Sequence, residues 1–171
     1  MIELMTKIIE LIRRSNFLLS LTILFSIFLA YYISLTIIYH FALYQYDIAF
    51  TETPNETIMQ ESFLKQLLFV VIIGPLFETL IFQKWLYQLL SLFKVLKRNK
   101  IWLILISAFI FGSIHIYSLS YIVYNVFAGI ILMSAYVLRK GKNPYLFVAT
   151  LHALMNLFVI LMEPLEQKWF G

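Results

Sequence analysis

Cysteine is absent from this chain of 171 residues, which excludes disulfide bonds, thiolate metal ligands and a cysteine nucleophile. Charged residues are scarce as well. They make up 13% of the sequence, whereas 62% of the residues are hydrophobic and the mean hydropathy is +0.88. This composition lies outside the range of soluble globular domains. It predicts a polytopic membrane protein in which any catalysis uses oxygen and nitrogen groups.

Long apolar segments alternate with short polar ones and predict five transmembrane helices. They cover about residues 17–39, 63–92, 101–117, 119–138 and 144–162. At 1.5 Å per residue each can cross a hydrocarbon core of roughly 30 Å, although the third is the shortest. Residues 1–14 carry apolar and charged side chains at helical spacing, which predicts an amphipathic helix on the membrane surface. The expected fold is an all-α, polytopic bundle of about five transmembrane helices plus this N-terminal interfacial helix.

The basic residues are unevenly placed along the chain. Ten of the thirteen precede the first, third or fifth predicted helix: Lys7, Arg13, Arg14, Lys94, Lys97, Arg98, Lys100, Arg139, Lys140 and Lys142. If the chain crosses five times, these residues lie on one side of the membrane, which the positive-inside rule assigns to the cytoplasm. We therefore expect a cytoplasmic N-terminus and an outer C-terminus in a bacterial plasma membrane. Nucleic-acid binding is not needed to explain the net charge of +4 and is not expected.

The sequence divides into three parts. Residues 1–62 are predicted to hold the interfacial helix, the first membrane anchor and a polar outer loop with the breaker Pro54-Asn55. Residues 63–162 are predicted to form a four-helix catalytic core around a polar cavity, and residues 163–171 a short tail. The triplet Asn55-Glu56-Thr57 matches a glycosylation acceptor on the outer loop, a pattern that is common by chance.

Three ionisable residues interrupt the apolar segments: Glu78, His115 and His152. A charge at the centre of a membrane span costs about 2.5 to 3.5 kcal/mol on insertion scales, so such residues usually face a protein interior and carry function. For Glu78 the alternatives are a structural carboxylate bonded to a neighbouring helix and a general base. For each histidine they are a packing or hydrogen-bonding contact and a catalytic group.

The neighbours of the two histidines favour a functional reading. Phe111 and His115 lie four residues apart on one helical face, and Ala108 and Gly112 on or near that face would let another backbone approach closely. His152 and Asn156 occupy positions i and i+4, so both side chains can point at one spot. Such a pair of donors can bridge helices or stabilise a developing oxyanion.

Two chemistries use these groups, and the residues alone leave both open. A carboxylate and an imidazole can hold and deprotonate a water while His152 and Asn156 polarise a carbonyl, which suffices for peptide hydrolysis without a covalent intermediate. Alternatively, Glu78, His115 and His152 can be three ligands of a catalytic zinc, with water as the fourth. No HExxH pattern is present, which removes only the commonest zinc motif.

The order and spacing of these motifs resemble a known family. Glu78, Phe111-x-x-x-His115 and His152-x-x-x-Asn156, each on its own span, resemble the CPBP group of intramembrane glutamic proteases. This group joins the type II CAAX prenyl endopeptidases with Abi-like bacteriocin-processing or immunity proteins. The resemblance covers the second to fifth predicted spans.

The resemblance implies roles for four residues. Glu78 and His115 would bind and activate water, and His152 and Asn156 would form the oxyanion site. It also implies that no cofactor is needed, although zinc is possible and the group has often been labelled metalloprotease. The expected partners are membrane lipid and a peptide or protein substrate.

The first motif departs from the family pattern EExxxR, because this chain reads Glu78-Thr79-x-x-x-Gln83. Losing the second glutamate and the arginine together removes a matched pair instead of stranding one buried charge. The neutral Thr79 and Gln83 are expected to support the site by hydrogen bonds. The departure bears on substrate choice and on catalytic efficiency.

The most favoured function is that of an intramembrane endopeptidase acting on a membrane-associated peptide, either prenylated or of the bacteriocin or leader type. A first alternative is a catalytically weak or inactive relative that acts as an immunity or adaptor protein by binding peptide. A second is a small transporter or proton relay that uses the same ionisable residues.

Overall fold

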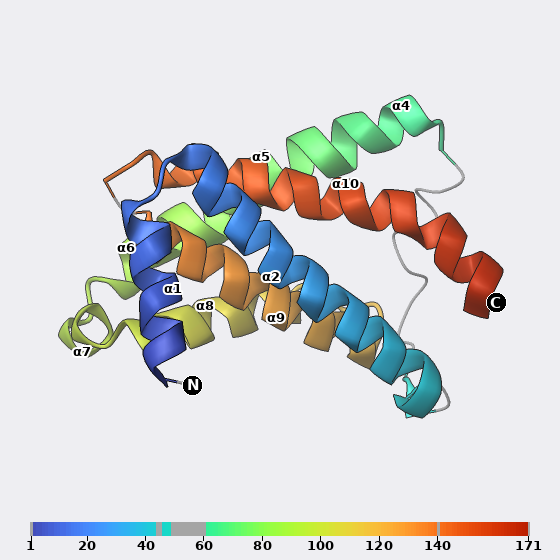
Figure 1. The fold of residues 1–171 in the computed structure, drawn as a ribbon, viewed down its shortest axis with the longest axis horizontal. Coiled ribbons are helices and arrows are strands. Elements are labelled where there is room, and N and C mark those ends of the chain that lie inside the picture. The colour runs from blue at the N-terminus through green and yellow to red at the C-terminus, as the bar shows by residue number, and fades with distance from the viewer. Residues whose placement is uncertain (1, 44–45, 49–60, 140, 171) are drawn as a thin grey trace.

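The structure is a computed structural model that describes residues 2–43, 46–48, 61–139 and 141–170. Its regular elements are all helical, and those labelled η are π-helical (Figure 1). They are α1 Ile2–Arg14, α2 Phe17–Ile38, η1 Tyr39–Leu43, α4 Phe63–Gln66, η3 Leu67–Ile73, α5 Gly74–Glu78, η4 Thr79–Trp85, α6 Leu86–Leu90, α7 Lys94–Arg98, α8 Lys100–Ser113, α9 Leu119–Leu138 and α10 Pro144–Phe170. The predicted all-α bundle is therefore confirmed. The breaker Pro54-Asn55 and the triplet Asn55-Glu56-Thr57 lie outside the described residues.

Side-chain caps and turn residues set the ends of the long helices. Asn16 caps α2, where its Oδ1 accepts a hydrogen bond from Leu19 N at 2.9 Å. Ser118 caps α9 in the same way, accepting from Tyr121 N at 3.2 Å. Gly141, with φ at +90°, supplies the left-handed backbone of the turn between α9 and α10.

Four helical stretches are long and apolar enough to cross a membrane: residues 17–42, 63–90, 119–138 and 144–165. The third predicted span differs from the expectation. Its helix, α8, ends at Ser113 and has 14 residues, about 21 Å, which is shorter than the roughly 30 Å of a bilayer core. The predicted number of spans therefore holds only approximately.

The predicted basic clusters meet at one end of the molecule, where α1, α7 and the turn between α9 and α10 lie together (Figure 1). Arg139 of this turn is buried and donates from Nη1 to Ser15 O at 2.8 Å and to Ser20 Oγ at 3.0 Å. Lys142 Nζ donates to Arg13 O at 2.9 Å. This common end agrees with a one-sided charge distribution, and its assignment to the cytoplasm stays a prediction.

The helix α10 is central to the bundle, since it contacts α2, α9 and three elements of the second long helix, η3, α5 and η4. The first long helix is more than an anchor, because Leu24, Phe28 and Tyr32 of α2 belong to the same buried core as residues of α9 and α10. Tyr31 donates a hydrogen bond to Tyr124 O of α9 at 2.8 Å. Helix α10 continues through Pro164 to Phe170, so the predicted C-terminal tail is helical over residues 163–170.

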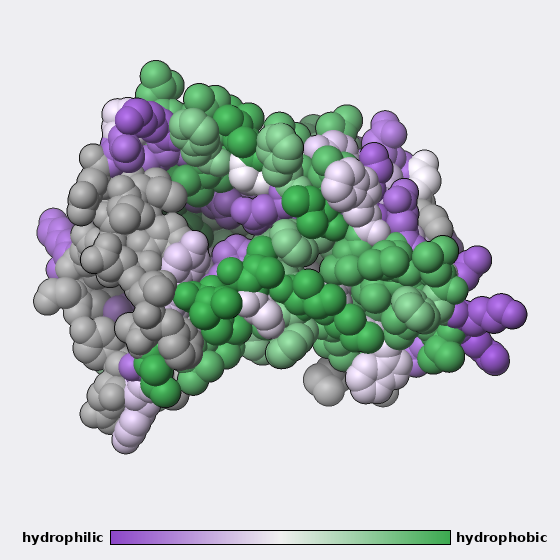
Figure 2. Space-filling view, turned by 180° about the vertical axis from the view of Figure 1, so that it is seen from behind, coloured by the Kyte–Doolittle hydropathy of each residue, from purple (hydrophilic) through white to green (hydrophobic). Residues whose placement is uncertain are grey.

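Hydrophobic side chains cover much of the outer surface, as expected for a protein surrounded by lipid. Figure 2 shows this hydrophobic surface together with a hollow in which hydrophilic side chains are visible. The bundle therefore combines a lipid-compatible exterior with polar groups recessed between its helices.

The contact between α8 and α9 is close because glycine is present on both helices. A Cβ added at Gly112 would lie 2.7 Å from Val126 N, and one added at Gly129 would lie 3.0 Å from Ala108 Cα. The prediction that Ala108 and Gly112 permit a close approach is thus confirmed, and the approaching backbone is that of α9.

Candidate active site

Glu78 lies at a change of helical geometry in the middle of the second long helix. It is the last residue of α5, which stands between the π-helical segments η3 and η4. Short π-helical segments are rare and often occur at functional sites. Gly74 lies one turn earlier, where an added Cβ would lie 3.0 Å from Phe69 O and at an ordinary contact distance of 3.7 Å from Glu78 Oε1. A side chain at this position would therefore crowd the backbone of η3.

The structure brings Glu78 to His152. Glu78 Oε2 lies 3.7 Å from His152 Nε2, and the two side chains are 33% and 5% exposed, respectively. Helix α10 holds the imidazole inside the bundle, while the carboxylate keeps contact with the surface. This pairing differs from the sequence interpretation, which coupled Glu78 to His115.

Phe111 lies between the two histidines. Its ring centroid is 4.8 Å from that of His115 and 5.8 Å from that of His152. His115 Nδ1 donates a hydrogen bond to Phe111 O at 2.7 Å. With Nδ1 as the donor, the Nε2 atom of a neutral His115 carries a lone pair and can accept a hydrogen bond. The motif Phe111-x-x-x-His115 thus fixes both the position and the tautomer of this ring.

Asn156 connects α10 to the second long helix. Its Nδ2 donates to Val70 O of η3 at 2.9 Å. This bond holds α10 beside the segment that leads to Glu78. One of the two N–H groups of the amide therefore donates to a backbone carbonyl, which leaves the second N–H for the oxyanion role that the sequence predicts.

Comparison with known proteins places the chain in a family. The family model of the Rce1-like type II CAAX prenyl endopeptidases matches residues 60–158, which is more than half of the chain. The chain belongs to the Rce1-like family. No curated protein and no solved structure matches. The family is one of CAAX-type intramembrane proteases, and its matched region contains Glu78, His115, His152 and Asn156.

The two residues that depart from the expected first motif of the Rce1-like family are fully buried. Thr79 Oγ1 and both polar side-chain atoms of Gln83 have no hydrogen-bond partner in the described part of the chain. The hydrogen bonds by which these side chains could support the site are thus not seen in the described part of the chain. Burying such groups unpaired costs about 1–3 kcal/mol each.

Zinc was the one cofactor that the sequence analysis left open. Within residues 2–43, 46–48, 61–139 and 141–170, no three histidine or acidic side chains are grouped so that they could hold a metal ion. Both the zinc alternative and a metal-free reaction stay predictions.

Two residues that the sequence analysis did not single out support the helix that carries Glu78. Gly74 avoids the close contact with Phe69 O described above, and Tyr145 Oη donates to Leu76 O at 3.1 Å. Lys84 Nζ lies 5.5 Å from the centroid of the Tyr145 ring. The contacts of Tyr145 depend on how α10 is placed beside α5, which no local sequence pattern signals.

Proposed function

We propose that this protein is an intramembrane endopeptidase in which Glu78 and His152 act together on a water molecule and on the substrate carbonyl. The observation that supports the proposal is the distance of 3.7 Å between Glu78 Oε2 and His152 Nε2 in a region closed to bulk water on the histidine side. A carboxylate and an imidazole on separate helices are brought together at this point of the Rce1-like match.

The distance suits a water that touches both groups. An oxygen atom placed beside the pair can lie about 2.8 Å from each atom, which is a normal hydrogen-bond length. One hydrogen of that water would point to Glu78 Oε2. The lone-pair side of the oxygen would face the substrate carbonyl carbon.

The proposed reaction proceeds in two steps with no covalent enzyme intermediate. Glu78 accepts a proton as the water oxygen forms a bond to the carbonyl carbon, and the carbonyl oxygen becomes an oxyanion. His152, with Nε2 as the donor, stabilises that negative charge. The carbon–nitrogen bond then breaks, and Glu78 returns the proton to the leaving amine. The products are a carboxylic acid and an amine.

His115 and Asn156 take supporting roles in this proposal. His115 Nε2 carries a lone pair, since its Nδ1 donates to Phe111 O, so this ring can accept a hydrogen bond at the site. Asn156 positions α10 through one N–H, which donates to Val70 O, and its second N–H can serve as a further oxyanion donor.

The expected substrate is a peptide that reaches the site from the membrane, since hydrophobic side chains surround the bundle. The Rce1-like family points to CAAX-type peptides, so a prenylated and a non-prenylated peptide of the same sequence form the natural pair of test substrates.

The test is peptide cleavage by purified full-length protein in detergent micelles. Glu78→Gln removes the proton acceptor and should reduce kcat by at least about 100-fold, the lower limit for losing general-base catalysis. Glu10→Gln removes one carboxylate from an exposed ion pair with Arg14 and should leave kcat unchanged. Equal cleavage by wild type and the folded Glu78→Gln variant would overturn the proposal.

A further inference from the structure

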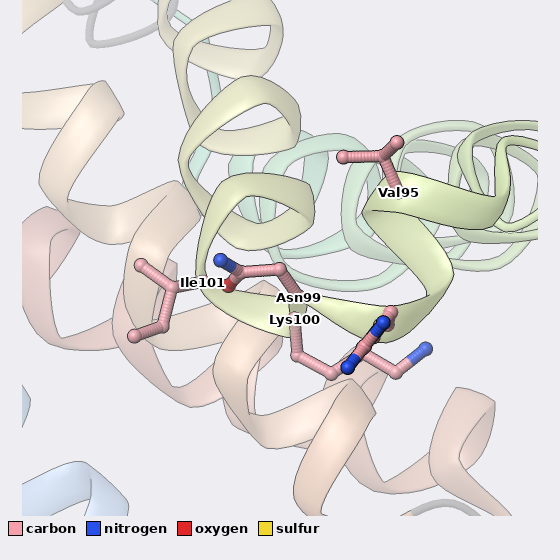
Figure 3. Close-up of a pocket in the computed structure, with 5 residues that line it drawn as sticks. Val95, Asn99, Lys100 and Ile101 are labelled. Carbon is pink, nitrogen blue, oxygen red and sulfur yellow. The ribbon is translucent and has the colours of Figure 1, made fainter.

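A surface pocket of about 680 Å³ lies at the junction of α7 and α8, away from Glu78. It is lined by Val95, Arg98, Asn99, Lys100 and Ile101. Figure 3 shows Val95 on α7 and both Lys100 and Ile101 at the start of α8, with Asn99 between the two helices. The pocket thus combines two cationic side chains and one amide with two aliphatic side chains.

The positive charge at this junction has no counterpart nearby in the sequence. No aspartate or glutamate occurs between Glu78 and Glu163, whereas eight of the thirteen basic residues do. Those eight are Lys84, Lys94, Lys97, Arg98, Lys100, Arg139, Lys140 and Lys142. Any neutralising charge for the α7–α8 junction must therefore come from another part of the chain or from a ligand.

The described part of the chain does not supply that charge. Its ion pairs with lysine or arginine are Lys7–Glu3, Arg14–Glu10 and Lys65–Glu61, and none involves a basic residue of 94–100. Lys7 and Arg14 of α1 are thus paired within their own helix, whereas no basic residue of α7 is in such a pair in the described part of the chain. This contrast exists although α1 and α7 lie at the same end of the molecule (Figure 1).

One cation of the pocket is held in place. Lys100 Nζ donates to Tyr87 Oη at 3.3 Å and lies 5.2 Å from the centroid of the Tyr87 ring. A lysine fixed over an aromatic ring loses less conformational freedom when it binds an anion than a free surface lysine does.

The aliphatic side chains of the pocket are exposed, with Val95 at 74% and Ile101 at 67%. Leu92 and Phe93, which precede α7, are exposed as well. In a protein that spans a membrane, exposed apolar side chains beside a basic cluster fit the boundary between acyl chains and headgroups.

We propose that the α7–α8 pocket binds the headgroup of an anionic phospholipid. The phosphate lies between Arg98 and Lys100 and accepts a hydrogen bond from the Asn99 amide, while the glycerol and upper acyl chains contact Val95 and Ile101. Arginine and lysine are the usual phosphate ligands, and a basic residue near an anionic membrane surface contributes about 1 kcal/mol.

The experiment measures lipid binding by the full-length protein in detergent, using native mass spectrometry with phosphatidylglycerol and phosphatidylcholine of equal chain length. Wild type should bind phosphatidylglycerol in preference to phosphatidylcholine. Arg98→Gln should weaken phosphatidylglycerol binding about fivefold, the factor that corresponds to the contribution of one basic residue near an anionic membrane surface. Arg98→Lys should keep most of the affinity.

Arg14→Gln is the matched control, since it removes the same charge from an exposed arginine at the same end of the molecule. It should leave phosphatidylglycerol binding unchanged. Equal affinity for the two lipids, or equal losses in Arg14→Gln and Arg98→Gln, would overturn the proposal. Displacement of the lipid by equimolar inorganic phosphate would also contradict it, because the site would then recognise a free anion without the lipid body.

Discussion

Replacing Gly112 with alanine should force α8 and α9 apart at one of their close contacts. The added Cβ would lie 2.3 Å from Val126 Cγ2, 2.7 Å from Val126 N and 3.0 Å from Ile122 O. The valine side chain can rotate, but the two backbone atoms belong to a helix. The backbone nitrogen would have to recede by about 0.7 Å to reach an ordinary contact distance of 3.4 Å.

The size of the effect follows from these contacts. Overpacking a well-packed interior costs about 1–3 kcal/mol, and a clash with backbone belongs at the upper end of that range. We therefore expect Gly112→Ala to lower the free energy of unfolding by about 3 kcal/mol. Because Phe111 is the neighbouring residue and contacts both histidines, peptide cleavage should fall as well.

The assay is unfolding by sodium dodecyl sulfate in mixed micelles, followed by circular dichroism. Ser113→Ala, one residue further along α8, is the control and should change the unfolding free energy by less than about 0.5 kcal/mol. Adding Val126→Ala to Gly112→Ala should restore only part of the stability, because the clash with Val126 N persists. Wild-type stability of Gly112→Ala alone would refute the reasoning.

Three further outcomes are expected. Although burial raises the pKa of Asp47, hydrogen bonds from Ser120 and Tyr39 lower it below the ordinary 3.8, so Asp47→Asn should destabilise the protein at pH 7. The stability difference between wild type and Asp47→Asn should be complete at pH values above about 3.9, the pKa of an aspartate in the unfolded chain. It should disappear as the pH falls through the lower pKa of Asp47 in the folded protein, and unfolding curves at several pH values measure this. Gln83→Met should stabilise the protein by about 1–3 kcal/mol in the same unfolding assay, because it removes two buried unpaired polar atoms, and a loss of stability would contradict this reading. Cleavage should continue in excess EDTA, and inactivation that zinc reverses would show that a metal takes part.

Several features of the fold could be predicted from local sequence patterns. Long apolar runs predicted the helices, and the small side chains of Ala108 and Gly112 on one face of α8 predicted a close helix contact. The partner of that contact could not be predicted, because the position of Gly129 opposite Ala108 depends on how two helices pack. The hydrogen bonds of Asp47 to Ser120, a residue 73 positions later, had no sequence signal either.

The residues of the candidate site were easier to predict than their pairing. Costly ionisable groups in apolar runs identified Glu78, His115 and His152, but the structure places His152 opposite Glu78. A regular helix was assumed for the second span, whereas π-helical segments stand on both sides of Glu78. One extra residue in a turn rotates the following side chains by about 100°, so 3.6-residue periodicity misjudges which side chains face the next helix.

The central claim is that Glu78 and His152 act as one catalytic unit, and a double-mutant cycle on peptide cleavage tests it most directly. The rates of Glu78→Gln, His152→Gln and the double variant are compared with wild type after each is shown to be folded. Residues that act as a unit are strongly non-additive, so the account predicts that the double variant loses no more activity than Glu78→Gln alone. Losses that multiply in the double variant would show that the two residues act independently, and full activity in His152→Gln would contradict the account altogether.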